Sequence, residues 1–329
     1  MNQQEFEQRY SRQWASFEAW LARQENKGSR GTAVDQPVAN ATDIPRLYRQ
    51  LCHHLSLARE RRYGSMLVDR LHSLVLRGHQ ELYSSRSNWV TRLGRFLVFE
   101  FPHTVRGEAK LFWLVSVLFY GSGLLMYLAV SSAPDMVYTM MDPQTASSLE
   151  TMYAPDTEKI GRERGSESDF AMFGFYIRNN IGIAFQTFAG GLLFTLGTLF
   201  YLAYNGLFFG AVAGHLTQLG YTETFYSFVI GHGSFELTAI VIAGMAGLKL
   251  GLALLKPGRL TRANALRAAG RVSARLIGGA AVMLVFAAFI EAFWSSTQFV
   301  PAAAKFVVGA GLWLSVAVYL VSSGRRYAA

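Results

Sequence analysis

The sequence predicts an all-α, polytopic membrane protein of about six transmembrane helices, one of them short or re-entrant, after an N-terminal helical cytoplasmic domain. Three observations support this class. Of the 329 residues, 51% are hydrophobic, and the mean hydropathy is +0.20, which is unusual for a soluble protein of this length. Beyond residue 109, apolar runs recur at the length of about 20 residues that a bilayer crossing needs. The first hundred residues are instead polar and basic.

Residues 1–105 are expected to form the cytoplasmic domain. An apolar stripe at helical spacing predicts its first helix, and consists of Phe6, Tyr10, Trp14, Phe17 and Leu21. The domain is expected to end in an amphipathic helix at 87–101, with aromatic and aliphatic residues on one side and arginines on the other. Such a helix can lie in the membrane interface or pack against the other soluble helices, and the sequence leaves both open.

Residues 106–329 are expected to form the transmembrane domain. Its apolar runs cover about 109–130, 179–204, 206–220, 226–255, 276–294 and 305–322. The run 206–220 is shorter than a normal span. It either crosses as a short helix or dips and returns as a re-entrant hairpin, and we expect six crossings in total.

The charges predict the orientation. Residues 1–110 carry 17 basic and 11 acidic residues, whereas the loop 131–178 carries eight acidic and four basic ones. The segment 256–275 has six basic residues and no acid, and the chain closes with Arg325 and Arg326. Because basic loops stay in the cytoplasm, both termini are expected there, with the acidic loop outside. The expected location is the bacterial cytoplasmic (inner) membrane.

Polar residues interrupt the apolar stretch 178–251, where lipid would not tolerate them alone; they are Asn179, Asn180, Asn205, His215, His232 and Glu236. His232 and Glu236 are four residues apart, so they share one face of a helix. Three interpretations remain. The residues form a structural hydrogen-bond network, which we expect, or a path for a proton, an ion or another solute, or a metal or catalytic half-site that His215 or another Glu completes.

Small residues recur at every fourth position in the same stretch. One ladder is Gly206, Gly210 and Gly214, and the other is Ala239, Ala243, Gly247 and Gly251. In membranes such ladders let helix backbones approach closely. They support a homodimer or packing within one chain equally well.

Several motifs in this stretch resemble the stage II sporulation protein M family. They are Arg178-Asn179-Asn180, Gly197-Thr198, Asn205-Gly206, then Gly231-His232-Gly233-Ser234-Phe235-Glu236-Leu237 and Ala243-Gly244-Met245-Ala246-Gly247. Gly231 departs from the pattern, which has Pro before the histidine.

The resemblance implies a bacterial inner-membrane protein without established catalytic residues. The sporulation member resembles a scaffold for peptidoglycan-degrading partners. Members from non-sporulating bacteria resemble this chain in carrying a cytoplasmic helical extension, and they commonly occur together with a MoxR-type AAA+ ATPase and von Willebrand A domain proteins. The resemblance therefore implies these proteins as partners.

We therefore expect a non-enzymatic membrane scaffold without a cofactor or a metal. The sequence has no HExxH, GxSxG, Walker or Rossmann motif, and it has one cysteine, Cys52. Anionic lipid is a better partner for the basic loops than nucleic acid. Glu291 is expected near the interface.

The alternative function is a transporter or channel with a polar path through Glu236, His232 and Asn205. A third, an intramembrane hydrolase, would need a second acid beside Glu236.

Overall fold

The computed structural model describes the chain except for residues 26–42, 84–88, 157–159, 162–167, 298 and 326–329. All regular elements of the described residues are helices, as the sequence predicts. Contacts divide the chain into two compact units, Met1–Arg92 and Leu93–Ala329. The division falls after Arg92 and not after residue 105, because the segment that follows packs against helices of the second unit.

The first unit contains three helices, α1 (Gln3–Glu25), α2 (Ile44–Glu60) and α3 (Ser65–Tyr83). Their apolar faces meet in one core, which includes four of the five predicted stripe residues and leaves Tyr10 partly buried. Within the core, the Trp14 indole N–H donates to His54 Nδ1 at 3.1 Å, and this polar pair is buried.

The predicted amphipathic helix is three elements in the structure. These are α4 (Trp89–Arg95), the π-helical turn η2 (Phe96–Glu100) and α5 (Phe101–Gly107). None of the α4 residues is buried. By contrast, Phe101 is buried, and its ring lies where a Cβ on Gly279 would be. The second part of the segment is therefore built into the membrane unit.

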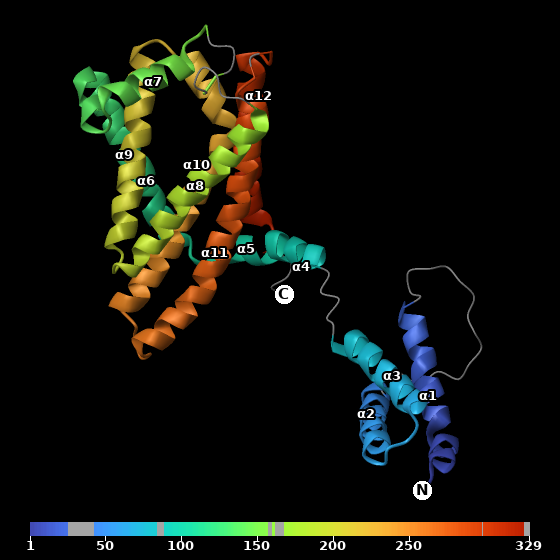
Figure 1. Ribbon diagram of the computed structural model, residues 1–329. Helices are drawn as coiled ribbons and strands as arrows, with labels where there is room; N and C mark the ends of the chain where they lie inside the picture. Colours follow the sequence, from blue (N-terminus) through green and yellow to red (C-terminus); the bar gives the residue numbers. More distant parts are fainter. Residues whose placement is uncertain (26–42, 84–88, 157–159, 162–167, 298, 326–329) are drawn as a thin grey trace. The chain divides into compact units, whose positions relative to one another are not determined.

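Six long helices form the second unit: α6 (Ala109–Ser132), α8 (Asp169–Ala189), α9 (Leu196–Gln218), α10 (Thr222–Leu255), α11 (Arg262–Ile290) and α12 (Ala302–Ser322). In the described part of the chain, five of these helices, all except α8, are long and apolar enough to cross a membrane. In this count α11 is taken together with the π-helical turn η5 (Glu291–Ser295) that continues it. The chain is thus a polytopic α-helical membrane protein. Figure 1 shows α8 running obliquely between the two ends of the bundle.

The second and third predicted spans are divided differently in the structure. The break lies in the 3₁₀ turn η4 (Gly190–Leu192) and the three residues after it, and not near Tyr204. Phe194 and Thr195 have positive φ values of 50° and 73° there, which reverses the chain tightly. The short run 206–220 is consequently the second part of the 23-residue helix α9, and does not form a re-entrant hairpin.

Helix α10 is the centre of the bundle. It contacts α6, α8, α9, α11 and α12, and it contributes more of the buried residues of the main core than any other helix. An apolar helix buried on all sides is expected at the core of a membrane bundle.

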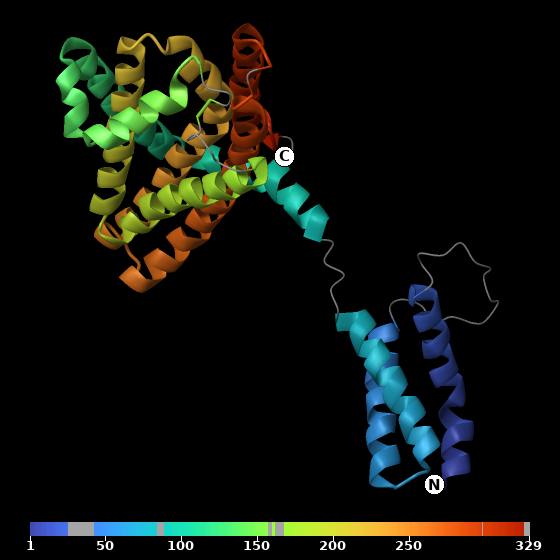
Figure 2. The same ribbon diagram turned by 45° about the horizontal axis from the view of Figure 1, so that its top comes forward.

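The bundle has two distinct ends. At one, the η4 turn lies against the last part of α10, and Arg106 of α5 donates to the carbonyl oxygen of Leu320 near the end of α12. At the other, α7 (Pro143–Tyr153) covers the junction of α9 and α10, as Figure 2 shows, and Thr224 donates to the carbonyl oxygen of Tyr153 at 2.7 Å. We call these the basic end and the acidic end, after the segments 256–275 and 131–178.

Candidate intramembrane cation site

Toward the basic end, glycines bring the backbones of η4, α9 and α10 into contact. A Cβ on Gly191 would lie 2.0 Å from the carbonyl oxygen of Gly247, and one on Gly251 would lie 2.4 Å from Thr195 Cγ2. No side chain fits at such distances. The small residues of the second ladder thus close the bundle on this side. Ala243, one helical turn before Gly247, is fully buried.

The first ladder joins α9 to α6. A Cβ on Gly206 would lie 2.3 Å from the carbonyl oxygen of Phe119, and one on Gly214 would lie 3.0 Å from Val130 Cβ. Both ladders are therefore occupied by contacts within the chain. They give no argument for a homodimer.

Toward the acidic end the helices separate around a chamber of about 280 Å³. Its walls are mostly apolar and aromatic, from α6, α7, α8, α9 and α10. Six polar or charged residues also line it: Tyr153, Asn179, Asn205, His232, Glu236 and Glu291. An apolar pocket with a few convergent polar groups is the usual form of a ligand site.

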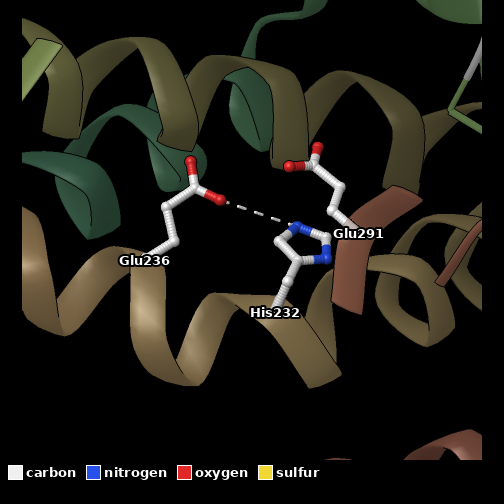
Figure 3. Close-up of side chains that lie close together, drawn as sticks. All are labelled: His232, Glu236 and Glu291. Atoms are coloured by element: carbon white, nitrogen blue, oxygen red, sulfur yellow. Dashed lines mark ion pairs between the residues drawn. The ribbon is translucent and has the colours of Figure 1, made fainter. Parts of the chain in front are cut away.

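His232, Glu236 and Glu291 lie together in this chamber (Figure 3). His232 Nε2 is 3.9 Å from a carboxylate oxygen of Glu236. One ligand atom from each of the three residues lies within 4.8 Å of the other two. Glu236 keeps 18% of its side chain exposed, whereas His232 keeps 6%. The glutamate thus faces the open space of the chamber, and the histidine lies in its wall.

Glu291 was expected near the interface, and it lies in the last turn of the span Arg262–Ser295. It is buried, with 8% of its surface exposed, and faces His232. Glu291 points inward because the end of the span that contains α11 is the π-helical turn η5, from Glu291 to Ser295. Such turns are rare in proteins, but those that occur often lie at functional sites, since the extra residue per turn redirects side chains. Glu291 is the only acid in the predicted run 276–294, and this was the signal that could have identified it.

The other predicted polar residues separate into two groups. Asn179 and Asn205 line the chamber, but their amide groups donate to Asn180 Oδ1 and to the carbonyl oxygen of Tyr201. Asn180 itself is buried beside Asn179. His215 is not part of the chamber: its Nε2 lies 2.8 Å from a Glu150 carboxylate oxygen of α7. It therefore fastens α7 to α9 and does not complete a site with His232.

A second set of contacts fixes the histidine. His232 Nδ1 lies 3.0 Å from Ser295 Oγ, and Ser295 is fully buried. The Lys305 ammonium donates to the carbonyl oxygens of Ser295 and Thr297, at 2.8 and 2.5 Å. Lys305 is itself buried, so it satisfies carbonyl groups that the end of a helix leaves open. The imidazole is thus held from η5, which Lys305 in turn anchors to α12.

This arrangement can bind a cation, relay a proton or polarise a water molecule. It also supplies, as Glu291, the second acid that the intramembrane hydrolase interpretation lacked. Among the described residues that line the chamber there is no serine, threonine or cysteine, and Ser295 lies behind the histidine with no exposed surface. A covalent route through a serine, threonine or cysteine nucleophile therefore has no group to start from among these residues.

Together the fold and this chamber define a polytopic helical membrane protein with a charged cluster enclosed by its spans. Residues 114–296 match the stage II sporulation protein M family, and the chain belongs to this family. Residues 4–84, which lie in the first unit, match a separate family described as a domain of unknown function (DUF8413).

One curated relative is an uncharacterized protein, MJ0793, of Methanocaldococcus jannaschii. It is 29% identical over 79 residues, which are 24% of this chain and 44% of the relative. The match thus spans less than half of the relative's length. No solved structure matches the chain.

Proposed function

We propose that this protein transports a small cation across the membrane through the chamber at His232, Glu236 and Glu291. The observation that carries the proposal is the cluster of two carboxylates and an imidazole enclosed among the membrane spans. Ionisable residues at such depth are costly, and in membrane proteins they mark ion and substrate pathways. Among the described residues that line the chamber there is no lysine or arginine, so its charge favours a cation over an anion.

The proposed transport needs a conformational change. The residues lining the chamber belong to the acidic-end half and the middle of the bundle, whereas the backbone contacts of Gly191 with Gly247 and of Gly251 with Thr195 close the basic end. Access from that end requires η4 to separate from α10. We therefore propose a transporter that opens alternately, rather than a permanently open channel.

The test is flux into liposomes that contain the purified protein, with encapsulated indicators for H⁺ and for Zn²⁺. We expect cation-dependent signals for the natural protein and a loss of at least tenfold for Glu236→Gln, which keeps the shape but removes the charge. Glu223→Gln is the matched control, because Glu223 is exposed and lies outside the chamber. Absence of flux, or equal flux in Glu236→Gln, would reject the proposal.

A second candidate is the non-enzymatic scaffold, and a different observation favours it. The first unit has its own core and matches a family of its own, which is the organisation of a docking module. In this proposal it binds a MoxR-type AAA+ ATPase or von Willebrand A domain proteins, and the membrane unit assembles as a homodimer. Mild-detergent purification of the full chain from native membranes, with mass spectrometry, tests it. A partner in defined ratio supports it, and a bare monomer rejects it.

We also propose that the protein lies in the bacterial cytoplasmic membrane with both termini in the cytoplasm. The basic segment 256–275 lies at the basic end of the bundle, and α7, which belongs to the acidic segment 131–178, lies at the opposite end. This is the distribution that the positive-inside rule requires.

A further inference from the structure

We infer that His232, Glu236 and Glu291 bind a divalent transition-metal cation such as Zn²⁺ or Mn²⁺. The inference deepens the proposed function, and rests on it only for the passage of that ion across the membrane. It extends the half-site of His232 and Glu236, which lacked a third ligand in the sequence, by the carboxylate that η5 brings from another helix.

The distances are close to those of a metal site. Bonds of about 2.0–2.2 Å put neighbouring ligand atoms of a tetrahedral site about 3.3–3.6 Å apart. The three ligand atoms here lie within 4.8 Å of one another, and His232 Nε2 is already 3.9 Å from Glu236. Rotation of two glutamate side chains that share a chamber closes the remaining difference of roughly 1 Å. The backbone of α10 and η5 need not move.

The histidine is oriented as a ligand. Its Nδ1 faces Ser295 Oγ at 3.0 Å, and its Nε2 faces the glutamates. With the proton on Nδ1 donated to Ser295, Nε2 presents its lone pair to the chamber. Metal-binding histidines nearly always use their second ring nitrogen in this way, which fixes the tautomer and the ring plane.

Charge also favours a dication. Two carboxylates within 4.8 Å of each other repel strongly in a low-dielectric surrounding. A divalent ion neutralises both, and most of the walls of the chamber are aromatic and aliphatic, so they offer the two carboxylates few other charges to pair with. The volume of about 280 Å³ leaves room for one or two water molecules as further ligands.

The ligand types select the metal. An imidazole with carboxylates suits Zn²⁺ and Mn²⁺, whereas Ca²⁺ and Mg²⁺ prefer oxygen ligands alone. Copper(I) prefers thiolates and thioethers, and no cysteine or methionine is among the described residues that line the chamber. The site thus differs from those of the common alkaline-earth ions.

The experiment is titration of the full-length protein in detergent, without a histidine tag and after removal of metals by a chelator. Zn²⁺ binding is followed by calorimetry, and Co²⁺ binding by its visible absorption bands, which report coordination by nitrogen and oxygen. We expect one tight site per chain, weakened at least tenfold in Glu291→Gln and in His232→Gln. His103→Gln is the matched control, because His103 is exposed and lies outside the chamber, and it should bind as the natural protein does.

Each outcome decides between the two proposals. Absence of a stoichiometric Zn²⁺ site, or equal affinity in folded Glu291→Gln, overturns the metal site. Glu291→Gln differs from the natural side chain in one atom, so it keeps the test valid if His232→Gln does not fold. Tight binding without flux in liposomes supports the metal site and rejects transport. Proton flux without Zn²⁺ binding supports transport and rejects the metal site.

Discussion

A Cβ atom on Gly210 would lie 2.0 Å from the carbonyl oxygen of Gly123, so α6 and α9 touch backbone to backbone. Because a backbone atom cannot move aside cheaply, Gly210→Ala must push the two helices apart. Overpacking of this kind costs about 1–3 kcal/mol. We expect a lower unfolding temperature in detergent, measured by size-exclusion chromatography of heated samples. Gly182→Ala is the control, since a Cβ there meets nothing within 4 Å; equal losses in both variants would contradict the contact.

The first unit should become less stable in acid through His54. Burial, and then the neighbouring His53, lower the pKa of His54 below its usual 6.5. The unfolded chain therefore binds more protons between the lowered pKa and 6.5, and stability falls as the pH falls through this window. Hydrogen exchange of peptides from α2, corrected for the intrinsic effect of pH, measures it.

The control for this prediction is a histidine without such an environment. His54→Gln should reduce the acid sensitivity, and His72→Gln, at an exposed position of α3, should leave it intact. If exchange in α2 rises equally with acid in His54→Gln and in the natural protein, another group is responsible.

Removal of the buried ammonium of Lys305 should loosen η5. Lys305→Met keeps the bulk of the side chain but leaves the carbonyl oxygens of Ser295 and Thr297 without their donor, at a cost of about 1–3 kcal/mol. We expect a lower unfolding temperature and weaker Zn²⁺ binding than in the natural protein. Lys256→Met, at an exposed position after α10, should change neither. Unaltered stability of Lys305→Met would show that the carbonyls find other donors.

The orientation predicts which cysteines a membrane-impermeant maleimide reaches from outside the cell. After replacement of Cys52 by Ala, Thr139→Cys at the acidic end should react in intact cells. Arg259→Cys at the basic end should react only after the membrane is opened. Both positions are exposed. The opposite pattern would invert the proposed topology.

Much of the fold could be predicted from the sequence, because long apolar runs and helical stripes report directly on membrane spans and on a helical core. The break between α8 and α9 could not. It depends on Phe194 and Thr195 with positive φ, which are not turn formers, and on the contact of Gly191 with Gly247, which is tertiary. Periodicity placed the break near the polar pair Asn205-Gly206, which lies inside a helix.

The site was predicted in part. The spacing of His232 and Glu236 put both on one face of α10, and the structure places them so. Glu291 was missed, since 55 or so positions separate it from Glu236 and only a π-helical turn aims it inward. His215 was included because it is polar in an apolar run, but its partner Glu150 lies on a helix outside the spans. Sequence pattern shows that a polar group needs a partner, and not which one it has.

The length of α10 has a practical consequence. Its 34 residues extend over about 51 Å, whereas the hydrocarbon core of a bilayer is about 30 Å thick. The helix that carries His232 and Glu236 therefore lies tilted or extends its ends into the headgroup layers, and its angle depends on the lipid. Acyl-chain length thus becomes a variable to hold constant in every reconstitution, and a deliberate change of it is a way to perturb the chamber without altering a single residue.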